Sequence, residues 1–149
     1  MLGGWTMMGL SSTFLLGAYN DRPTARENAA TVFSAYQLSD LALLVAAAFG
    51  AHHSQYALAE MIGTSGFENP AVAAASLSVA ALVKSSQFPF AGLFVRSMEG
   101  ATPTSAMGSG GLSAHAGIVL LSATTPLWFG FDWARALVGS VGALTAVQA

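Results

Sequence analysis

The fold is decided by residues 71–95, AVAAASLSVAALVKSSQFPFAGLFV. Lys84 is the one charged residue in this stretch, and the next charges along the chain are Glu68 and Arg96. Pro89 follows shortly after, where a helix would lose a backbone N–H and the ring would crowd the preceding turn. Backbone groups freed inside a bilayer must be satisfied by protein or by water in a cavity. The stretch therefore predicts a transmembrane helix interrupted around Lys84–Pro89, with the lysine and the break in one hydrated site.

The composition of the whole chain indicates a membrane protein. Of its 149 residues, 54% are hydrophobic and 8% are charged, whereas soluble domains carry roughly a quarter charged residues. Positions 1–20, 41–59 and 100–131 contain no charged side chain, and each gap is about long enough for one helix across a ~30 Å hydrocarbon layer. A soluble all-helical domain is the less favoured alternative. We predict an all-α membrane protein, a single partial transmembrane domain over residues 1–149, with five spans at about 2–19, 28–51, 71–95, 102–128 and 133–149.

Composition also excludes several classes of function. The chain has no cysteine, so disulfides, thiolate metal sites and cysteine nucleophiles are absent. A net charge of -2 without a basic cluster argues against nucleic-acid binding. We find no flavin, iron–sulfur or quinone motif, so we expect neither a cofactor nor a metal. Sixteen glycines and many alanines allow close helix packing in a membrane, so we expect lipids and other membrane subunits as partners, including a chain that supplies further helices.

Two ionisable residues lie within predicted spans, Asp40 in the second and Lys84 in the third. A charge near the bilayer centre costs ~3 kcal/mol or more, so such residues face the bundle interior and form pairs or carry ions. Burial makes the ammonium form of a lysine costly, so Lys84 is a candidate to bind and release a proton. The alternative for Lys84 is a side chain that reaches the membrane surface. The alternative for Asp40 is a carboxyl satisfied by polar neighbours such as Gln37.

Other residues could contribute to a relay or to its geometry. His115 lies inside the fourth predicted span, where a relay histidine and a neutral, hydrogen-bonded histidine are both open. His52 and His53 fall in a predicted loop, where we expect them to be solvated. Gly100 and Pro103 predict a tight turn before the fourth span, because proline is tolerated in the first turn of a helix.

Four motifs are similar to those of a known family: GGWTMMGLSSTFLLGAY near the N-terminus, then KSSQFPF, MEGATPTSA and AHAG between Lys84 and Gly117. They resemble the W-E-x-x-G-L, K-S-A-Q-x-P and M-x-G-P-T-P-x-S-A-L motifs of the antiporter-like membrane subunits of respiratory complex I, especially subunit 5. That family includes the Mrp-type sodium/proton antiporters and the membrane partner of inorganic-carbon uptake complexes. Order and spacing agree from Gly4 to about Val147, and Asp40 falls where the family has V-G-D.

The resemblance implies an antiporter-like helix bundle in which Lys84 sits in a broken helix and passes protons along a hydrated axis. Thr6 stands where the family has a glutamate beside this lysine, and Ser109 stands where it has a histidine. Asp40 and His115 are therefore the candidate partners of Lys84. Family members are several times longer than this chain, which implies a split or partial subunit.

The resulting hypothesis is a proton-translocating membrane-arm subunit of NADH:quinone oxidoreductase, with Lys84 as the relay and the redox chemistry carried out by other subunits. One alternative is a non-conducting structural half-subunit, which the loss of the glutamate at Thr6 favours. Another is the membrane partner of an inorganic-carbon uptake complex, which passes protons to drive a zinc-containing, carbonic-anhydrase-like protein. A split subunit suggests the mitochondrial inner membrane, with a bacterial plasma membrane or a thylakoid as alternatives.

Overall fold

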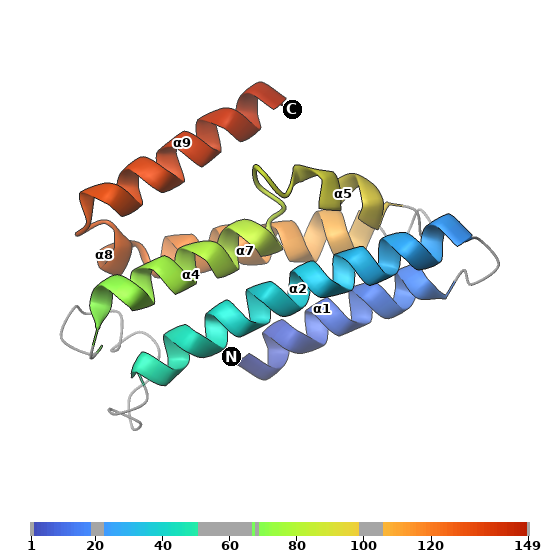
Figure 1. Cartoon of the computed structure of the whole chain (residues 1–149), viewed down its shortest axis with the longest axis horizontal. Coiled ribbons are helices and arrows are strands. Elements are labelled where there is room, and N and C mark those ends of the chain that lie inside the picture. Colours follow the sequence, from blue (N-terminus) through green and yellow to red (C-terminus); the bar gives the residue numbers. More distant parts are fainter. Residues whose placement is uncertain (1, 19–22, 51–66, 68, 99–105, 149) are drawn as a thin grey trace.

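The computed structural model describes residues 2–18, 23–50, 67, 69–98 and 106–148. All regular secondary structure in these ranges is helical, as the sequence predicts (Figure 1). The elements in chain order are α1 (Leu2–Gly17), α2 (Pro23–Gly50), α4 (Pro70–Lys84), α5 (Ala91–Ser97), the π-helix η2 (Ala106–Ser113), α7 (Ala114–Ala123), α8 (Thr125–Trp128) and α9 (Asp132–Gln148).

Small residues place α4 at the centre of the bundle. Its Ala73, Ala74, Ala80 and Ala81 are all fully buried, and alanine lets neighbouring helix backbones approach closely. The helix contacts α2, α7, α8 and α9, while α1 packs against α2 and η2. Figure 1 shows α1, α2, α4 and α7 running side by side along the long axis of the molecule.

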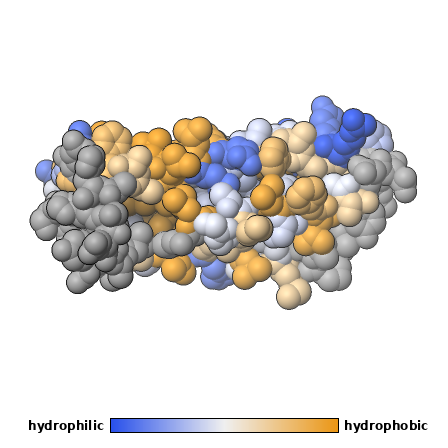
Figure 2. Space-filling view, turned by 90° about the horizontal axis from the view of Figure 1, so that it is seen from below, coloured by the Kyte–Doolittle hydropathy of each residue, from blue (hydrophilic) through white to orange (hydrophobic). Residues whose placement is uncertain are grey.

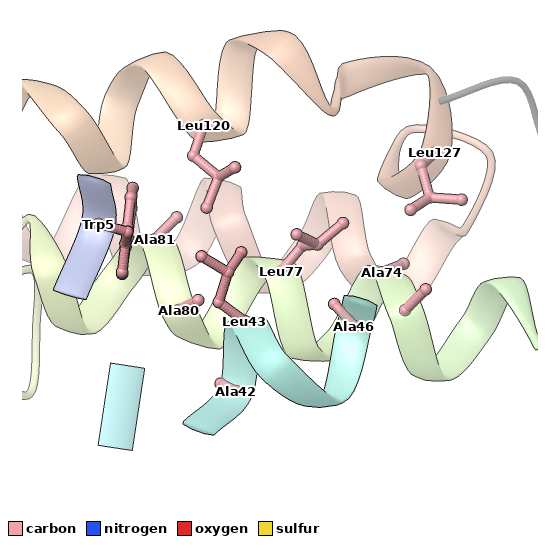
Figure 3. Close-up of a cluster of buried hydrophobic side chains, with 11 residues drawn as sticks. Trp5, Ala42, Leu43, Ala46, Ala74, Leu77, Ala80, Ala81, Leu120 and Leu127 are labelled. Carbon is pink, nitrogen blue, oxygen red and sulfur yellow. The ribbon is translucent and has the colours of Figure 1, made fainter. Parts of the chain in front are cut away.

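Larger side chains complete the core (Figure 3). Leu43 of α2, Leu77 of α4 and Leu120 of α7 belong to one buried cluster, with Trp5 of α1 at one end and Leu127 of α8 at the other. The cluster joins five elements in one apolar interior, so the position of α1 relative to α4 is fixed by packing as well as by polar contacts.

A buried serine makes two of the polar contacts between α1, α2 and α4. Ser39 of α2 is fully buried, and its Oγ accepts a hydrogen bond from Trp5 Nε1 at 3.2 Å. The same hydroxyl donates to the carbonyl oxygen of Ala80 on α4 at 2.8 Å. One side chain therefore connects α1, α2 and α4 and satisfies a polar group in the core.

The predicted interruption is present between α4 and α5. The first of these helices begins at Pro70, where Asn69 acts as N-cap and accepts a hydrogen bond from the Val72 amide at 3.4 Å. It ends at Lys84, and the next helix begins only at Ala91.

Hydrogen bonds around Ser86 end the helix, and Pro89 follows three residues later. The Ser86 amide donates to the Val83 carbonyl at 3.1 Å, and the Gln87 amide donates to the Leu82 carbonyl at 3.0 Å. Ser86 has a φ of 52°, the left-handed conformation that glycine usually adopts in this C-terminal cap. The sequence prediction located the break correctly but assigned its cause to Pro89, because no glycine marks the cap.

α9 reaches the segment between α4 and α5. The hydroxyl of Thr145 accepts a hydrogen bond from the Phe88 amide at 3.0 Å and donates one to the Val141 carbonyl at 2.8 Å. Figure 1 shows α9 along one side of the bundle, with the C-terminus above the break; Ala134 near its start is fully buried.

The described part of the chain does not confirm five membrane spans. Within it, Pro23–Phe49 is the one helix long and apolar enough to cross a membrane, and an 18-residue window inside it has a mean hydropathy of 1.6. Pro70–Lys84 and Gly111–Ala123 are apolar but shorter. The third predicted span is divided into α4 and α5, and the fourth into η2, α7 and α8. The first and fifth are uninterrupted but form helices of 16 and 17 residues. The number of spans remains a prediction.

The outer surface carries many large apolar side chains. Figure 2 shows hydrophobic residues over much of the described part of one face, with hydrophilic residues between them and at one end. Phe14, Leu41, Val119 and Val147 are each more than half exposed. Such an exterior is typical of a protein whose outer helices contact lipid or further protein.

Candidate functional site

The candidate site is built around Lys84, the last residue of α4. The residue is 1% exposed, and its side chain is the largest of the fully buried side chains in the described ranges. Because α4 ends here, the lysine lies where the regular helix gives way to the turn at Ser86. The sequence therefore places a long basic side chain at a helix end that is enclosed by other helices.

The amine of Lys84 contacts α1 and α2. Nζ donates a hydrogen bond to the carbonyl oxygen of Trp5 at 3.1 Å. It lies 3.8 Å from Oδ1 of Asp40, an ion pair without a direct hydrogen bond. It also lies over two aromatic rings, 4.5 Å from the centroid of Tyr36 and 5.2 Å from that of Trp5.

Asp40 on α2 supplies the carboxylate of the site. Its side chain is 11% exposed, and its buried Oδ1 accepts no hydrogen bond from the described residues. The hydroxyl of Thr6, at the position where the resemblance implies a glutamate, donates within its own helix to the carbonyls of Leu2 and Gly3. The negative charge nearest to Lys84 in the described ranges thus comes from α2 and not from α1.

A glycine on α1 makes room for the amine. A methyl group added at Gly9 would lie 2.9 Å from Nζ of Lys84 and 3.5 Å from Cδ2 of Tyr36. A real Cβ essentially never comes that close to another heavy atom, so the amine occupies space that any other residue at position 9 would take.

The remaining predicted residues lie elsewhere. His115 is on α7 with an exposed side chain, and the structure does not bring it to the Lys84 amine. Pro89 lies in the segment after α4. Gly100 and Pro103, together with the predicted loop histidines, lie outside the described residues. No group of three possible metal-ligating side chains occurs within the described ranges.

Sequence reasoning missed three residues of the site: Trp5, Gly9 and Tyr36. A helical-spacing argument could have found Tyr36, which lies four residues before Asp40 and therefore on the same face of its helix. The same spacing relates Trp5 to Gly9. The packing of α1 and α2 around the end of α4, which brings these two faces to the lysine, has no signal in a single sequence.

The arrangement can hold and exchange a proton. An ammonium at this position is stabilised by the carboxylate of Asp40 and the carbonyl of Trp5, while its burial disfavours the charge. Because these two effects oppose each other, small changes around the amine can change whether it carries a proton. Ionisable side chains paired inside a helix bundle commonly serve ion movement.

Comparison with known proteins identifies the family of the chain. Residues 1–149 match the family described as "NADH:quinone oxidoreductase/Mrp antiporter, TM". The chain is 29% identical to a probable inorganic carbon transporter subunit, DabB1, of Halothiobacillus neapolitanus, over 99% of this chain and 28% of that protein. It is 29% identical to the NADH-quinone oxidoreductase subunit L of Neisseria meningitidis, over 97% of this chain and 24% of the relative.

A chloroplast protein shows the same degree of similarity. The chain is 27% identical to NAD(P)H-quinone oxidoreductase subunit 5 of Lemna minor, over 95% of this chain and 20% of the relative. The chain therefore spans between a fifth and somewhat more than a quarter of the length of these proteins. These relatives come from bacteria and a chloroplast, so a mitochondrial location stays a prediction.

Proposed function

Because the chain belongs to the NADH:quinone oxidoreductase/Mrp antiporter transmembrane family, we propose that it is a split or partial proton-translocating membrane-arm subunit of an NADH:quinone oxidoreductase. Lys84 is the proton relay in this proposal. The observation that carries it is a buried amine at the end of an interrupted helix, 3.8 Å from a carboxylate. The relatives named as quinone oxidoreductase subunits support the choice of complex.

Lys84 acts by changing its protonation state. A proton that reaches the neutral amine is held by the charge of Asp40 and by the hydrogen bond to the Trp5 carbonyl. The proton leaves when water or another side chain competes with these two oxygens. His115, exposed on α7, extends the relay through water on that side of the bundle. Other subunits oxidise NADH and reduce quinone, and thereby supply the energy.

The partners follow from the same proposal. Other membrane subunits, one of them a chain that supplies the remaining helices, cover part of the apolar exterior, and lipid covers the rest. The membrane is the mitochondrial inner membrane, with a bacterial plasma membrane or a thylakoid as alternatives.

The test uses the complex purified through an affinity tag on this chain. Lys84→Met keeps the length of the side chain and removes the amine. We expect the complex to assemble and its proton-to-electron ratio, measured by proton uptake in inverted vesicles, to fall below that of the unmodified complex. Arg135→Met is the matched control, because Arg135 is exposed and pairs with Asp132 within one turn of α9; it should leave the ratio unchanged.

The outcome separates the alternatives. An unchanged ratio in an assembled Lys84→Met complex would contradict the relay and favour a non-conducting structural subunit. The inorganic carbon transporter relative supports a second candidate function. Proteins that purify with the tagged chain decide between the two complexes, because NADH-oxidising subunits indicate the first and a zinc-containing, carbonic-anhydrase-like protein indicates the second.

A further inference from the structure

The surroundings of the Lys84 amine contain more than its carboxylate partner. We propose that Trp5, Gly9 and Tyr36 form an ammonium-binding pocket, and that this pocket stabilises protonated Lys84 where α1 offers no carboxylate. Tyr36 and Gly9 are then positioning residues for the relay, and the proposal rests on the proposed function of Lys84.

Few charges of the described residues face the amine, so we expect other groups to stabilise it as well. The helix α1 contains no ionisable side chain from Leu2 to Gly17. On α2, Asp40 and Tyr36 face the amine, and α4 carries no charge besides Lys84 itself. On the η2–α7 side the ionisable residue is His115, whose side chain is exposed. Among the described residues, the anionic contact is one carboxylate at 3.8 Å without a hydrogen bond.

Two aromatic rings lie close to the amine in addition to its oxygen partners. An ammonium has three N–H donors, and within the described part of the chain it makes one hydrogen bond, to the Trp5 carbonyl. Nζ lies 4.5 Å from the ring centroid of Tyr36 and 5.2 Å from that of Trp5. Both distances are within the range of about 6 Å in which a ring face attracts a cation, and the attraction is strongest where water is excluded.

The absence of a side chain at Gly9 lets the Lys84 amine lie close to α1. A methyl group there would lie 2.9 Å from Nζ and 3.6 Å from Cβ of Tyr36. Because Nζ is the end of a flexible side chain, the fold can absorb the added methyl group by moving the amine. The amine would then move away from the Trp5 carbonyl and the ring faces. We therefore expect Gly9→Ala to displace the Lys84 amine without preventing folding.

The first test compares two variants of Tyr36 in the purified complex. Tyr36→Phe keeps the ring face, whereas Tyr36→Leu removes it. We expect the Phe variant to retain proton translocation and the Leu variant to lose most of the part that Lys84→Met abolishes. We also expect about a tenfold increase in proton concentration, or one pH unit, to restore the Leu variant, because more acid repopulates the ammonium.

The second test compares two glycines of α1. Gly9→Ala should lower proton translocation and be restored by acid in the same way. Gly4→Ala is the matched control, since a methyl group at Gly4 meets no atom within 4 Å. If the Leu variant of Tyr36 fails to assemble, the comparison of Gly9→Ala with Gly4→Ala tests the pocket instead, because neither variant removes a buried side chain.

Each outcome has a defined meaning. Equal flux in the Phe, Leu and unmodified complexes would refute the pocket, and so would a Phe variant as impaired as the Leu variant, since that would assign the effect to the hydroxyl. Normal flux in Gly9→Ala refutes it as well. A normal Lys84→Met complex overturns the proposed function itself, which the Tyr36 and Gly9 variants cannot do.

Discussion

At the scale of single residues, the environment of Lys84 is divided among three helices. α4 contributes the lysine, α2 contributes Asp40 and the ring of Tyr36, and α1 contributes a backbone carbonyl through Trp5. A buried charge is stable only where such groups replace the water it has lost. The site therefore exists only when all three helices are in place, so its chemistry depends on the fold around it.

The sequence predicted part of this site. Lys84 and Asp40 stood out because each is a lone charge in an apolar stretch, and the structure brings them together. Trp5 and Tyr36 did not stand out, because aromatic side chains are common in apolar helices and a ring that faces an amine looks the same in a sequence as one that faces leucine. Gly9 was one of sixteen glycines, and its role depends on a contact between helices.

We predict that Lys84 and Asp40 act as one unit. Asp40→Asn removes the charge but keeps the shape, so it should lower proton translocation by leaving the ammonium without its anion. In a double-mutant cycle with Lys84→Met, the unfolding free energies should show a coupling of about 0.5–3 kcal/mol. Asp132→Asn is the control, because that carboxylate is exposed and pairs with Arg135 near the surface. Additive effects at Lys84 and Asp40 would show that the two do not interact.

At the scale of elements, α4 and α7 approach each other through a glycine. A Cβ added at Gly117 would lie 2.8 Å from Cβ of Ser85 and would also collide with the Ala81 carbonyl. That carbonyl already accepts a hydrogen bond from the Ser85 hydroxyl at 2.7 Å. These groups belong to the backbone and to a short side chain, so they cannot move aside as a flexible amine can.

We therefore predict that Gly117→Ala destabilises the bundle. Overpacking of a close helix contact costs about 1–3 kcal/mol, and it should lower the unfolding free energy measured for the detergent-solubilised chain. Gly139→Ala on α9 should be neutral or stabilising by up to about 1 kcal/mol, because a methyl group there meets no atom within 4 Å and alanine favours helix. If both variants have the same stability, the approach of α7 to α4 is looser than the structure indicates.

The elements themselves were predictable to different degrees. The charge-free positions 1–20 and 100–131 contain α1 and the group η2, α7 and α8, because a membrane imposes such gaps on composition. α2 was predicted less well, since it begins at Pro23, five residues before the predicted start at 28, and includes the charged residues Arg26 and Glu27. The break after Lys84 was also located, because proline is a visible signal. Its cause was not, since Ser86 adopts a conformation for which the sequence would normally show glycine. The π-helix at Ala106–Ser113 had no signal that we recognised.

At the scale of the whole molecule, the chain is a family member with much of its apolar surface uncovered. It spans 20–28% of the length of the relatives described above. Large exposed side chains on α1, α2 and α9, among them Phe14, Leu41 and Val147, have no apolar partner sufficient to bury them within the described ranges. Sequence composition predicted such an exterior, but it does not determine which part lipid covers and which part protein covers.

The bond between Thr145 and Phe88 makes one backbone proton a reporter of helix docking. Amides 85, 86, 87 and 90 donate within the end of α4 and the turn after it, whereas the amide of residue 88 donates to α9. An amide bonded across two elements exchanges with deuterium only when these separate. We expect slow exchange at Phe88, faster exchange in Thr145→Val, and an unchanged rate in Thr145→Ser, which keeps the acceptor.

Mass spectrometry of the peptide that contains Phe88 measures this rate. Equal rates in the Val and Ser variants would mean that α9 does not protect the amide. If they differ as expected, the deuterium content of this peptide reports the opening of the contact between α9 and the segment after Lys84. The measurement is made in the intact complex and needs no probe attached to the protein.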